Sequence, residues 1–426
     1  MKKIQAETKN RVLGLCILIA ALFGSAVAKA DVVLDWNVIA VNTAVTNRQN
    51  PFAQARYAAI VQLAVFESVN AITGEYHPYL GTIVAPPGAC PEAAAIQAAY
   101  RVLSTYFPAT STLAAERAKS LATIPDGQAK TDGIATGDAA ALAMIALRAN
   151  DGSSPAQFKI PGPPVPGEWQ ATPSCPIVNG VAVGIAFQWQ NITPFGIRRA
   201  SDFLLDPPPA LASRAYAKTY NEVMTVGGID STERPQDRAN VALFYAASSP
   251  TQVFNQAVQQ VAQERWHSLS ENARALALMN MAVNDSLVAA FLNKYLYNFW
   301  RPETAIHAGD TDGNPKTDPD PSFVPFVTTP CFPSYPSNHG SAANSAAEVL
   351  RRIYGEGGHF MTLSNPTVPD IVLRYTTFEQ ITDDISDARV YGGIHFRNDQ
   401  VAGQHLGDAI GKAVYTHNLR RMHDDD

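Results

Sequence analysis

Apolar residues recur every three or four positions over much of this chain, which is the spacing of an amphipathic α-helix. The strongest example is PFAQARYAAIVQLAVFESVNAIT at residues 51–73, and the segment at 32–45 shows a shorter version of the pattern. Helices are also predicted at residues 91–107, 111–123, 127–149, 210–226, 232–248, 250–265 and 269–292. The periodicity therefore predicts an all-α protein, although it does not specify the topology.

Residues 151–207 interrupt the helical pattern with Pro- and Gly-rich sequence such as PGPPVPGEWQ. This segment contains four aromatic residues that need burial, namely Trp169, Phe187, Trp189 and Phe195. We therefore expect a long ordered crossover and not a flexible linker. The predicted organisation is an N-terminal helical region with this crossover at 31–207, followed by a C-terminal helical catalytic domain at 208–426. A chain of 426 residues with 46% hydrophobic residues can bury the core that this requires.

The closing helix is expected to begin near Asp399. It carries Gly403, Gly407 and Gly411 at intervals of four, which places the three glycines on one helix face. This spacing predicts a groove for close helix packing and differs from that of a phosphate-binding loop.

The first thirty residues have the order of a targeting segment. Four basic residues precede or begin the apolar run VLGLCILIAALFGSAV, and the small-residue sequence AKA follows it. This order predicts a cleavable secretory signal at 1–30 and an exported protein, periplasmic or secreted, without a stable membrane anchor after cleavage. The alternative is a membrane anchor, but about sixteen apolar residues are short for a transmembrane span.

Charge limits the partners of the mature chain. The sequence contains 32 Lys and Arg and 38 Asp and Glu. Residues 1–30 hold five of the basic residues and one of the acidic residues. Removal of the signal leaves 27 basic and 37 acidic residues, a net charge of −10. This balance argues against nucleic acid as a partner and favours a small, specific anion as the ligand of any positive pocket.

Three cysteines follow residue 30. An exported protein can form disulfides, and Cys90 with Cys175 is the expected pair because both lie in Pro-rich, loop-like sequence. Cys331 is then left over, and we interpret it as a small buried hydrophobic residue.

Residues with catalytic potential gather in three short segments between positions 294 and 399. The first, KYLYNFWRP, separates Lys294 and Arg301 by seven positions, so both are expected on one face of a helix that Pro302 ends. The second, YPSNHGSA, leads into a run of small residues. This predicts free backbone N–H groups of a new helix beside Ser337 and His339.

The third segment, ARVYGGIHFRND, adds Arg389, a second imidazole in His395, and Asp399, which is expected to orient that ring. Three cations, a helix N-terminus and two histidines together describe a pocket for a tetrahedral, multiply charged oxyanion. Taken singly, each cation is better explained as a solvated surface group and each histidine as a structural one. The joint order of the three segments favours the pocket.

These segments resemble the superfamily of vanadium-dependent haloperoxidases and type-2 phosphatidic acid phosphatases, whose motifs read K-x6-R-P, P-S-G-H and S-R-x5-H. The matching residues are Lys294, Arg301, Pro302, Pro336, Ser337, His339, Arg389 and His395. Two positions differ, since Asn338 replaces a Gly and Ala388 replaces a Ser. Asn adopts a left-handed backbone more readily than most residues, so the turn is expected to survive. The order of further segments, including PGEWQ and RPETAI, extends the resemblance over nearly the whole mature chain.

The resemblance implies an all-α fold of two packed helical bundles with the site in the C-terminal one. It implies vanadate as the cofactor and hydrogen peroxide and halide as substrates. His395 is then expected to bind the vanadium, His339 to act as the acid–base group, and Phe332 to influence the choice of halide. The residues expected to neutralise the vanadate oxygens are Lys294, Arg301, Arg389 and the backbone amides near Ser337 and Asn338. Asp285 is suggested as an acid close to Arg389.

Two other functions use the same residues. A phosphatase on this scaffold would hydrolyse phosphomonoesters, with His395 attacking phosphorus and His339 protonating the leaving oxygen. A protein that only binds oxyanions would need the cations and the helix N-terminus but not two placed histidines. The length of the chain and its N-terminal helical half favour the haloperoxidase.

Overall fold

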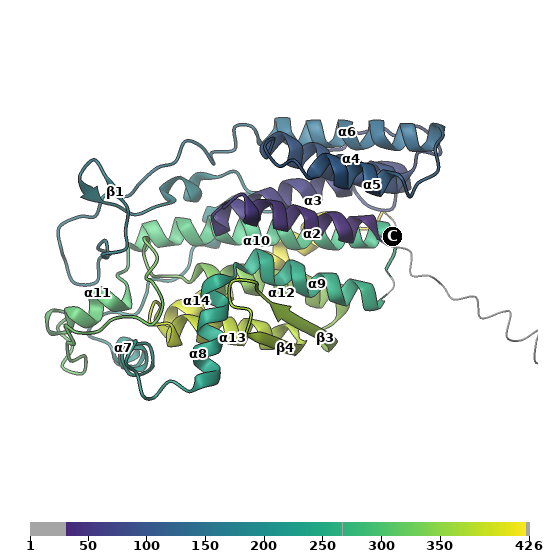
Figure 1. Cartoon of the computed structure of the whole chain (residues 1–426). Helices are drawn as coiled ribbons and strands as arrows, with labels where there is room; N and C mark the ends of the chain where they lie inside the picture. Colours follow the sequence, from purple (N-terminus) through teal and green to yellow (C-terminus); the bar gives the residue numbers. More distant parts are fainter. Residues whose placement is uncertain (1–30, 266, 423–426) are drawn as a thin grey trace, which may run out of the picture. The chain divides into compact units, whose positions relative to one another are not determined.

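The computed structural model describes residues 31–265 and 267–422, and α-helices make up most of them (Figure 1). The predicted secretory signal lies outside the described residues. The helices are α2 (Val32–Thr46), α3 (Pro51–Thr73), α4 (Pro91–Tyr106), α5 (Leu113–Leu121), α6 (Gln128–Arg148), α7 (Arg214–Val226), α8 (Gln236–Ala247), α9 (Pro250–Arg265), α10 (Leu269–Tyr297), α11 (Pro302–His307), α12 (Asn338–Tyr354), α13 (Phe378–Tyr391) and α14 (Arg397–His417). Every helix predicted from periodicity is present, so the all-α prediction is confirmed.

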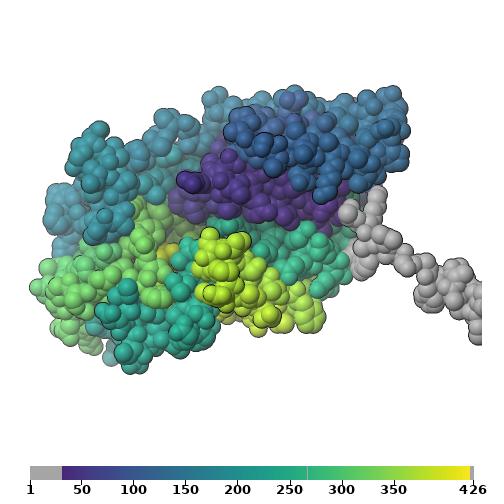
Figure 2. Space-filling model, viewed as in Figure 1, coloured from purple at the N-terminus to yellow at the C-terminus, as the bar shows by residue number. Residues whose placement is uncertain are grey.

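Helix α10 joins two groups of helices. It packs against α3, which in turn contacts α4 and α6, and on its other side it contacts α12 and α14 (Figure 1). Figure 2 shows the residues of α2 and α3, in purple, lying between the blue N-terminal helices and the green C-terminal part. This is the two-bundle architecture that the family resemblance implied.

The central position of α10 follows from its sequence. Nearly every residue from Ala273 to Phe291 is buried, and a capping box of Ser268 and Glu271 fixes the first turn. By length and composition α10 is apolar enough to cross a bilayer, yet 94% of its most apolar window is buried inside the protein. This burial is what a core helix requires, because such a helix is covered by protein on all sides.

The glycines of α14 allow it to lie directly on α12. A Cβ atom at Gly403, Gly407 or Gly411 would come within 2.7, 2.3 and 2.7 Å of backbone carbonyl oxygens on or just before α12. The predicted packing groove is therefore confirmed. The contact at Gly403 is with the carbonyl of Ser337, so this groove also holds the N-terminus of α12 in place.

The crossover is ordered, as predicted, and contains the short helices η1 (Phe187–Asn191) and η2 (Ala200–Phe203) and the hairpin of β1 (Ile177–Val178) and β2 (Val181–Ala182). Trp169, Trp189 and Phe195 are buried, and Phe187 is half-buried. The buried carboxylate of Asp285 on α10 accepts hydrogen bonds from the backbone N–H groups of residues 195, 196 and 197 at 2.7, 2.6 and 3.0 Å. These bonds anchor the crossover, and among the described residues Asp285 and Arg389 form no hydrogen bond or ion pair with each other.

Besides α11 and the β1–β2 hairpin, two further features of the fold were not predicted. One is an antiparallel hairpin of β3 (Gly357–Ser364) and β4 (Val372–Thr377), which contacts α9. The other is helix α13, which carries Arg389 in its last turn.

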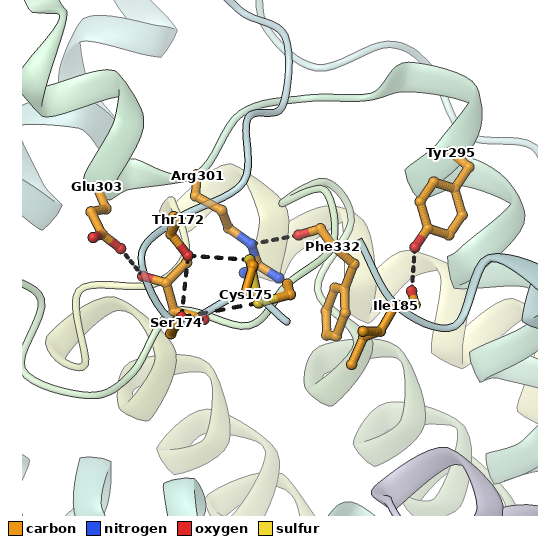
Figure 3. Close-up of a disulfide and its surroundings, with 10 residues drawn as sticks. Thr172, Ser174, Cys175, Ile185, Tyr295, Arg301, Glu303 and Phe332 are labelled. Carbon is orange, nitrogen blue, oxygen red and sulfur yellow. Dashed lines mark hydrogen bonds between the residues drawn. A yellow bond between two sulfur atoms is a disulfide. The ribbon is translucent and has the colours of Figure 1, made fainter. Parts of the chain in front are cut away.

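The expected disulfide between Cys90 and Cys175 is wrong. Cys175 of the crossover is bonded to Cys331, with 5.3 Å between the Cα atoms (Figure 3). Cys90 is free at the N-terminus of α4. Loop-like sequence identified the crossover cysteine but not its partner, because the fold brings together residues 156 positions apart. The bond therefore ties the crossover to the loop that precedes α12.

Candidate oxyanion-binding active site

The predicted site residues converge where the C-terminal end of α10, the N-terminal ends of α12 and α14, and the last turn of α13 meet. Four of them, Asn338, His339, Arg389 and His395, line one cavity of about 370 Å³. Its remaining wall is largely apolar and includes Phe332. A second cavity of about 270 Å³ is lined by carboxamides and apolar groups and has no charged side chain in its wall. The first cavity, with Arg389 and two histidines in its wall, is therefore the candidate for anion chemistry.

Lys294 and Arg301 do not share a helix face, contrary to the prediction. Asn298 takes a left-handed conformation with φ of 47° and ends α10 at Tyr297, so Arg301 lies in the following loop. Pro302 begins α11 instead of ending α10. The two cations still converge, because the loop brings Arg301 back toward the segment before α12.

Backbone carbonyl groups of that segment hold both cations. The Lys294 ammonium donates to the carbonyls of residues 333 and 334, each at 2.8 Å. The Nε–H of Arg301 donates to the carbonyl of Phe332 at 2.8 Å (Figure 3). The Phe332 ring also lies 5.2 Å from Lys294 Nζ and 5.0 Å from Arg301 Cζ, within cation–π range. Phe332 thus positions both charges while facing the cavity.

Hydrogen bonds on both sides fix the ring of His395. Its Nδ1 lies 2.9 Å from Asp399 Oδ2, and its Nε2 lies 3.0 Å from Arg301 Nη1. Because the guanidinium can only donate and the carboxylate accepts, the proton sits on Nδ1 and the lone pair on Nε2. Asp399 stands where it can orient the ring, as the spacing suggested.

Ser334 is a site residue that the sequence reasoning missed. Its Oγ–H donates to Asp399 Oδ2 at 2.6 Å and lies 3.3 Å from His395 Nδ1, and its carbonyl is one of the two that hold Lys294. The serine is fully buried. Its place in the PSYPS sequence, beside the recognised motif, was the available signal, but a serine in a loop has no distinctive pattern.

The N-terminus of α12 presents free backbone donors, as predicted. Ser337 is the capping residue, and its Oγ accepts from the N–H of Gly340 at 3.1 Å. Asn338 and His339 occupy the first two helical positions, whose N–H groups precede the first intrahelical bond. Asn338 is helical, so the left-handed conformation considered for this position does not occur.

Arg389 is buried at the end of α13. Its Nη1 donates to the carbonyl of Tyr245 at 3.3 Å, while its Nε has no protein partner among the residues that the structure describes. Within the same described residues, Nη2 of Arg301 also lacks a partner. Two buried guanidinium groups therefore keep unused donors.

The charge balance of the site calls for an anion. Burial lowers the pKa of Arg301 to about 9 and that of Arg389 to about 10. Burial, followed by the neighbouring arginines, lowers the pKa of Lys294, and burial together with the cations lowers the pKa of both histidines. Three cations thus face one carboxylate, Asp399, whose pKa burial raises to about 6. Uncompensated buried charge is costly, and a bound oxyanion would remove that cost.

The donor set suits an oxyanion better than a bare metal cation. No three His, Cys, Asp or Glu side chains are grouped as metal ligands in residues 31–265 and 267–422. One imidazole lone pair surrounded by cations and N–H groups matches a tetrahedral oxyanion of vanadate or phosphate type.

Comparisons with known proteins support this interpretation. The family described as the VCPO second helical-bundle domain matches residues 274–424, which hold all the site residues. The vanadium chloroperoxidase of Curvularia inaequalis is 27% identical over 188 residues, which are 37% of this chain and 30% of that protein. The matched part is therefore less than a third of the relative's length.

Solved structures share the fold over a longer span. A bacterial vanadium-dependent iodoperoxidase superimposes with a TM-score of 0.76 at 23% identity, covering 91% of this chain and 96% of that one. The holo form of a bacterial vanadium-dependent chloroperoxidase gives 0.68 at 16% identity, covering 86% and 92%. Both helical bundles and the crossover thus belong to one shared architecture.

Proposed function

We propose that this chain, which belongs to the vanadium haloperoxidase superfamily, is a vanadate-dependent haloperoxidase that oxidises a halide with hydrogen peroxide. The observation that carries the proposal is the buried cluster of three cations around the Nε2 lone pair of His395, with His339 on the same cavity. The proposal includes export, which rests on the sequence of residues 1–30 alone.

Cofactor binding falls to residues that the structure already holds in place. Lys294, Arg301 and Arg389 would neutralise the charge of vanadate, and the unused N–H groups at the start of α12 would donate to its oxygens. His395 would bind the vanadium through Nε2, since Asp399 keeps the proton on Nδ1. When bound, vanadate would supply a Lewis-acid centre that makes hydrogen peroxide reactive toward halide.

Proton movement falls to His339. Its imidazole lines the cavity, and burial together with the charge of Arg389 lowers its pKa, while a hydrogen bond with the Ser248 backbone acts in the opposite direction. The ring is therefore neutral near pH 7 and able to accept a proton from hydrogen peroxide. The apolar wall around Phe332 would exclude bulk water from the reacting groups.

Halide-dependent, peroxide-driven halogenation of a phenolic dye tests the proposal, with purified protein assayed with and without orthovanadate. Activity that needs vanadate and is suppressed by phosphate is the expected result. The same sample is assayed for phosphomonoester hydrolysis, because a histidine with its lone pair on Nε2 could also attack phosphorus once Arg301 turns to the anion. Vanadate-inhibited hydrolysis without halogenation would assign the chain to the phosphatases.

A His339→Ala variant separates catalysis from binding. It is expected to retain phosphate affinity, measured by calorimetry, and to lose turnover, because it removes the proton acceptor but none of the three cations. Unchanged turnover in this variant would contradict both enzyme assignments, and absence of turnover in the parent protein with intact binding would indicate an oxyanion-binding protein.

A further inference from the structure

The side chain of Asn338 is buried without a partner at the site. It is 4% exposed, and both Nδ2 and Oδ1 lack a hydrogen-bond partner among the described residues. An unsatisfied buried amide is costly, so a ligand in the cavity that supplied the missing hydrogen bonds would be favoured at this position. Asn338 lines the cavity together with His339, Arg389 and His395, which identifies where that ligand would sit.

The chemistry of this amide differs from that of its neighbours. The unused groups of Arg301 and Arg389 are donors and can only contact oxygen lone pairs. The Asn338 carboxamide offers a donor and an acceptor side by side. Its Oδ1 would repel a fully ionised oxygen but can accept a hydrogen bond from a hydroxyl group.

We propose that the carboxamide of Asn338 recognises a protonated tetrahedral oxyanion, with Nδ2 donating to one oxygen and Oδ1 accepting from a hydroxyl of the same anion. The inference rests on the proposed function only in taking the site to bind a tetrahedral oxyanion. Vanadate and phosphate both carry a hydroxyl near neutral pH, whereas sulfate is fully ionised and carries none. The side chain therefore selects phosphate-like anions over sulfate, beyond what the cations alone achieve.

Calorimetric titration of the full chain with phosphate, orthovanadate and sulfate at pH 7 tests this selectivity without any turnover. Asn338→Ala is expected to weaken phosphate and vanadate binding about tenfold, the equivalent of one or two hydrogen bonds. Sulfate binding is expected to change less than about threefold, because the lost donor contact is offset by removal of the repelling carbonyl. The ratio of phosphate to sulfate affinity should fall accordingly.

Two further variants guard against a loss of folding. Asn338→Gly keeps the helix start without a side chain and should reproduce the Ala result. Gln400→Leu is the matched control, because Gln400 is also a buried carboxamide with two unpartnered atoms in the described part of the chain. It lies beside Gly340 and does not line the cavity, so the selectivity should be unchanged.

The outcomes separate this inference from the proposed function. Equal losses for all three anions, or no loss in either Asn338 variant, would overturn the inference and leave the haloperoxidase proposal intact. Failure of the parent protein to bind any of the anions would overturn both. Selective loss for phosphate and vanadate would support the inference whether or not the chain proves to halogenate.

Discussion

Removal of the Ser334 hydroxyl should change how the site responds to pH. Ser334→Ala deletes the 2.6 Å hydrogen bond to Asp399 Oδ2, which after burial is the largest influence on the pKa of that carboxyl and acts to lower it. A hydrogen bond to a charged group contributes about 1.5–3 kcal/mol, equivalent to about one or two pH units. The pKa of Asp399, about 6 in the parent protein, should therefore move to about 7 or above.

The sign of the stability effect follows from linkage. Since burial raises the pKa of Asp399 from 3.8 to about 6, the folded state binds the proton more tightly than the unfolded state. The stability contributed by this group falls as pH rises between these values, by about 3 kcal/mol in all. In Ser334→Ala the stability contributed by Asp399 should go on falling up to about pH 7 or 8. Each further unit by which the pKa of Asp399 rises should cost about 1.4 kcal/mol more.

Urea unfolding at pH 5 and pH 8 measures this difference. We expect Ser334→Ala to lose more stability, relative to the parent protein, at pH 8 than at pH 5. Ser345→Ala is the control, because it removes another fully buried hydroxyl, bonded to Ser286 at 3.1 Å, without touching Asp399. Ser334→Thr, which keeps a hydroxyl, should restore the parent profile. A loss equal at both pH values in Ser334→Ala would refute the reasoning, since it would reflect packing alone.

Three further predictions concern the groups around the site. Replacing Cys175 and Cys331 by Ser should lower the free energy of unfolding by up to about 5 kcal/mol, because the disulfide restricts a loop of 156 residues in the unfolded chain. Cys90→Ser, which removes no disulfide, should leave that free energy unchanged, and thermal unfolding of the variants measures the difference. Gly407→Ala places a Cβ 2.3 Å from the Ser341 carbonyl oxygen, so α12 must shift. The free energy of unfolding, measured with urea, should fall by about 2 kcal/mol or more, and phosphate binding should weaken. Phosphate affinity should fall as pH rises through the alkaline range, because burial and then the charge of Arg301 lower the pKa of the Lys294 ammonium in the empty site. Calorimetry at pH 8, 9 and 10 checks this.

The sequence was sufficient to predict most of the helices and most of the residues that converge at the cavity, but not helix α13 or the place of Ser334. Helix positions depend on local periodicity, and the segments around Lys294, His339 and His395 contain charged and polar groups in a recognisable order. What it did not predict was how those groups are connected. Arg301 was predicted on the same helix as Lys294. The local sequence does not indicate that Asn298, three residues before Arg301, takes a left-handed conformation and ends α10.

The sequence also did not predict the hydrogen-bond partners of the buried charged groups. The family resemblance suggested Asp285 as an acid close to Arg389, yet its oxygens accept hydrogen bonds from three backbone N–H groups of the crossover. The cations Lys294 and Arg301 are held by backbone carbonyls, which every residue has. Every residue has backbone N–H or C=O groups, so a contact to the backbone does not depend on residue type and cannot be predicted from it. Only the folded structure shows such contacts.

One short segment, residues 331–334, holds two of the three cations and the carboxylate that orients His395. Cys331 anchors it to the crossover through the disulfide, and the carbonyl and ring of Phe332 hold Arg301. The last two residues supply the carbonyls that bind Lys294, and the Ser334 hydroxyl binds Asp399. A displacement of this segment would therefore move two cations and the orienting carboxylate together. The crossover, which contributes few side chains to the cavity, supports the chemistry by fixing this segment in place.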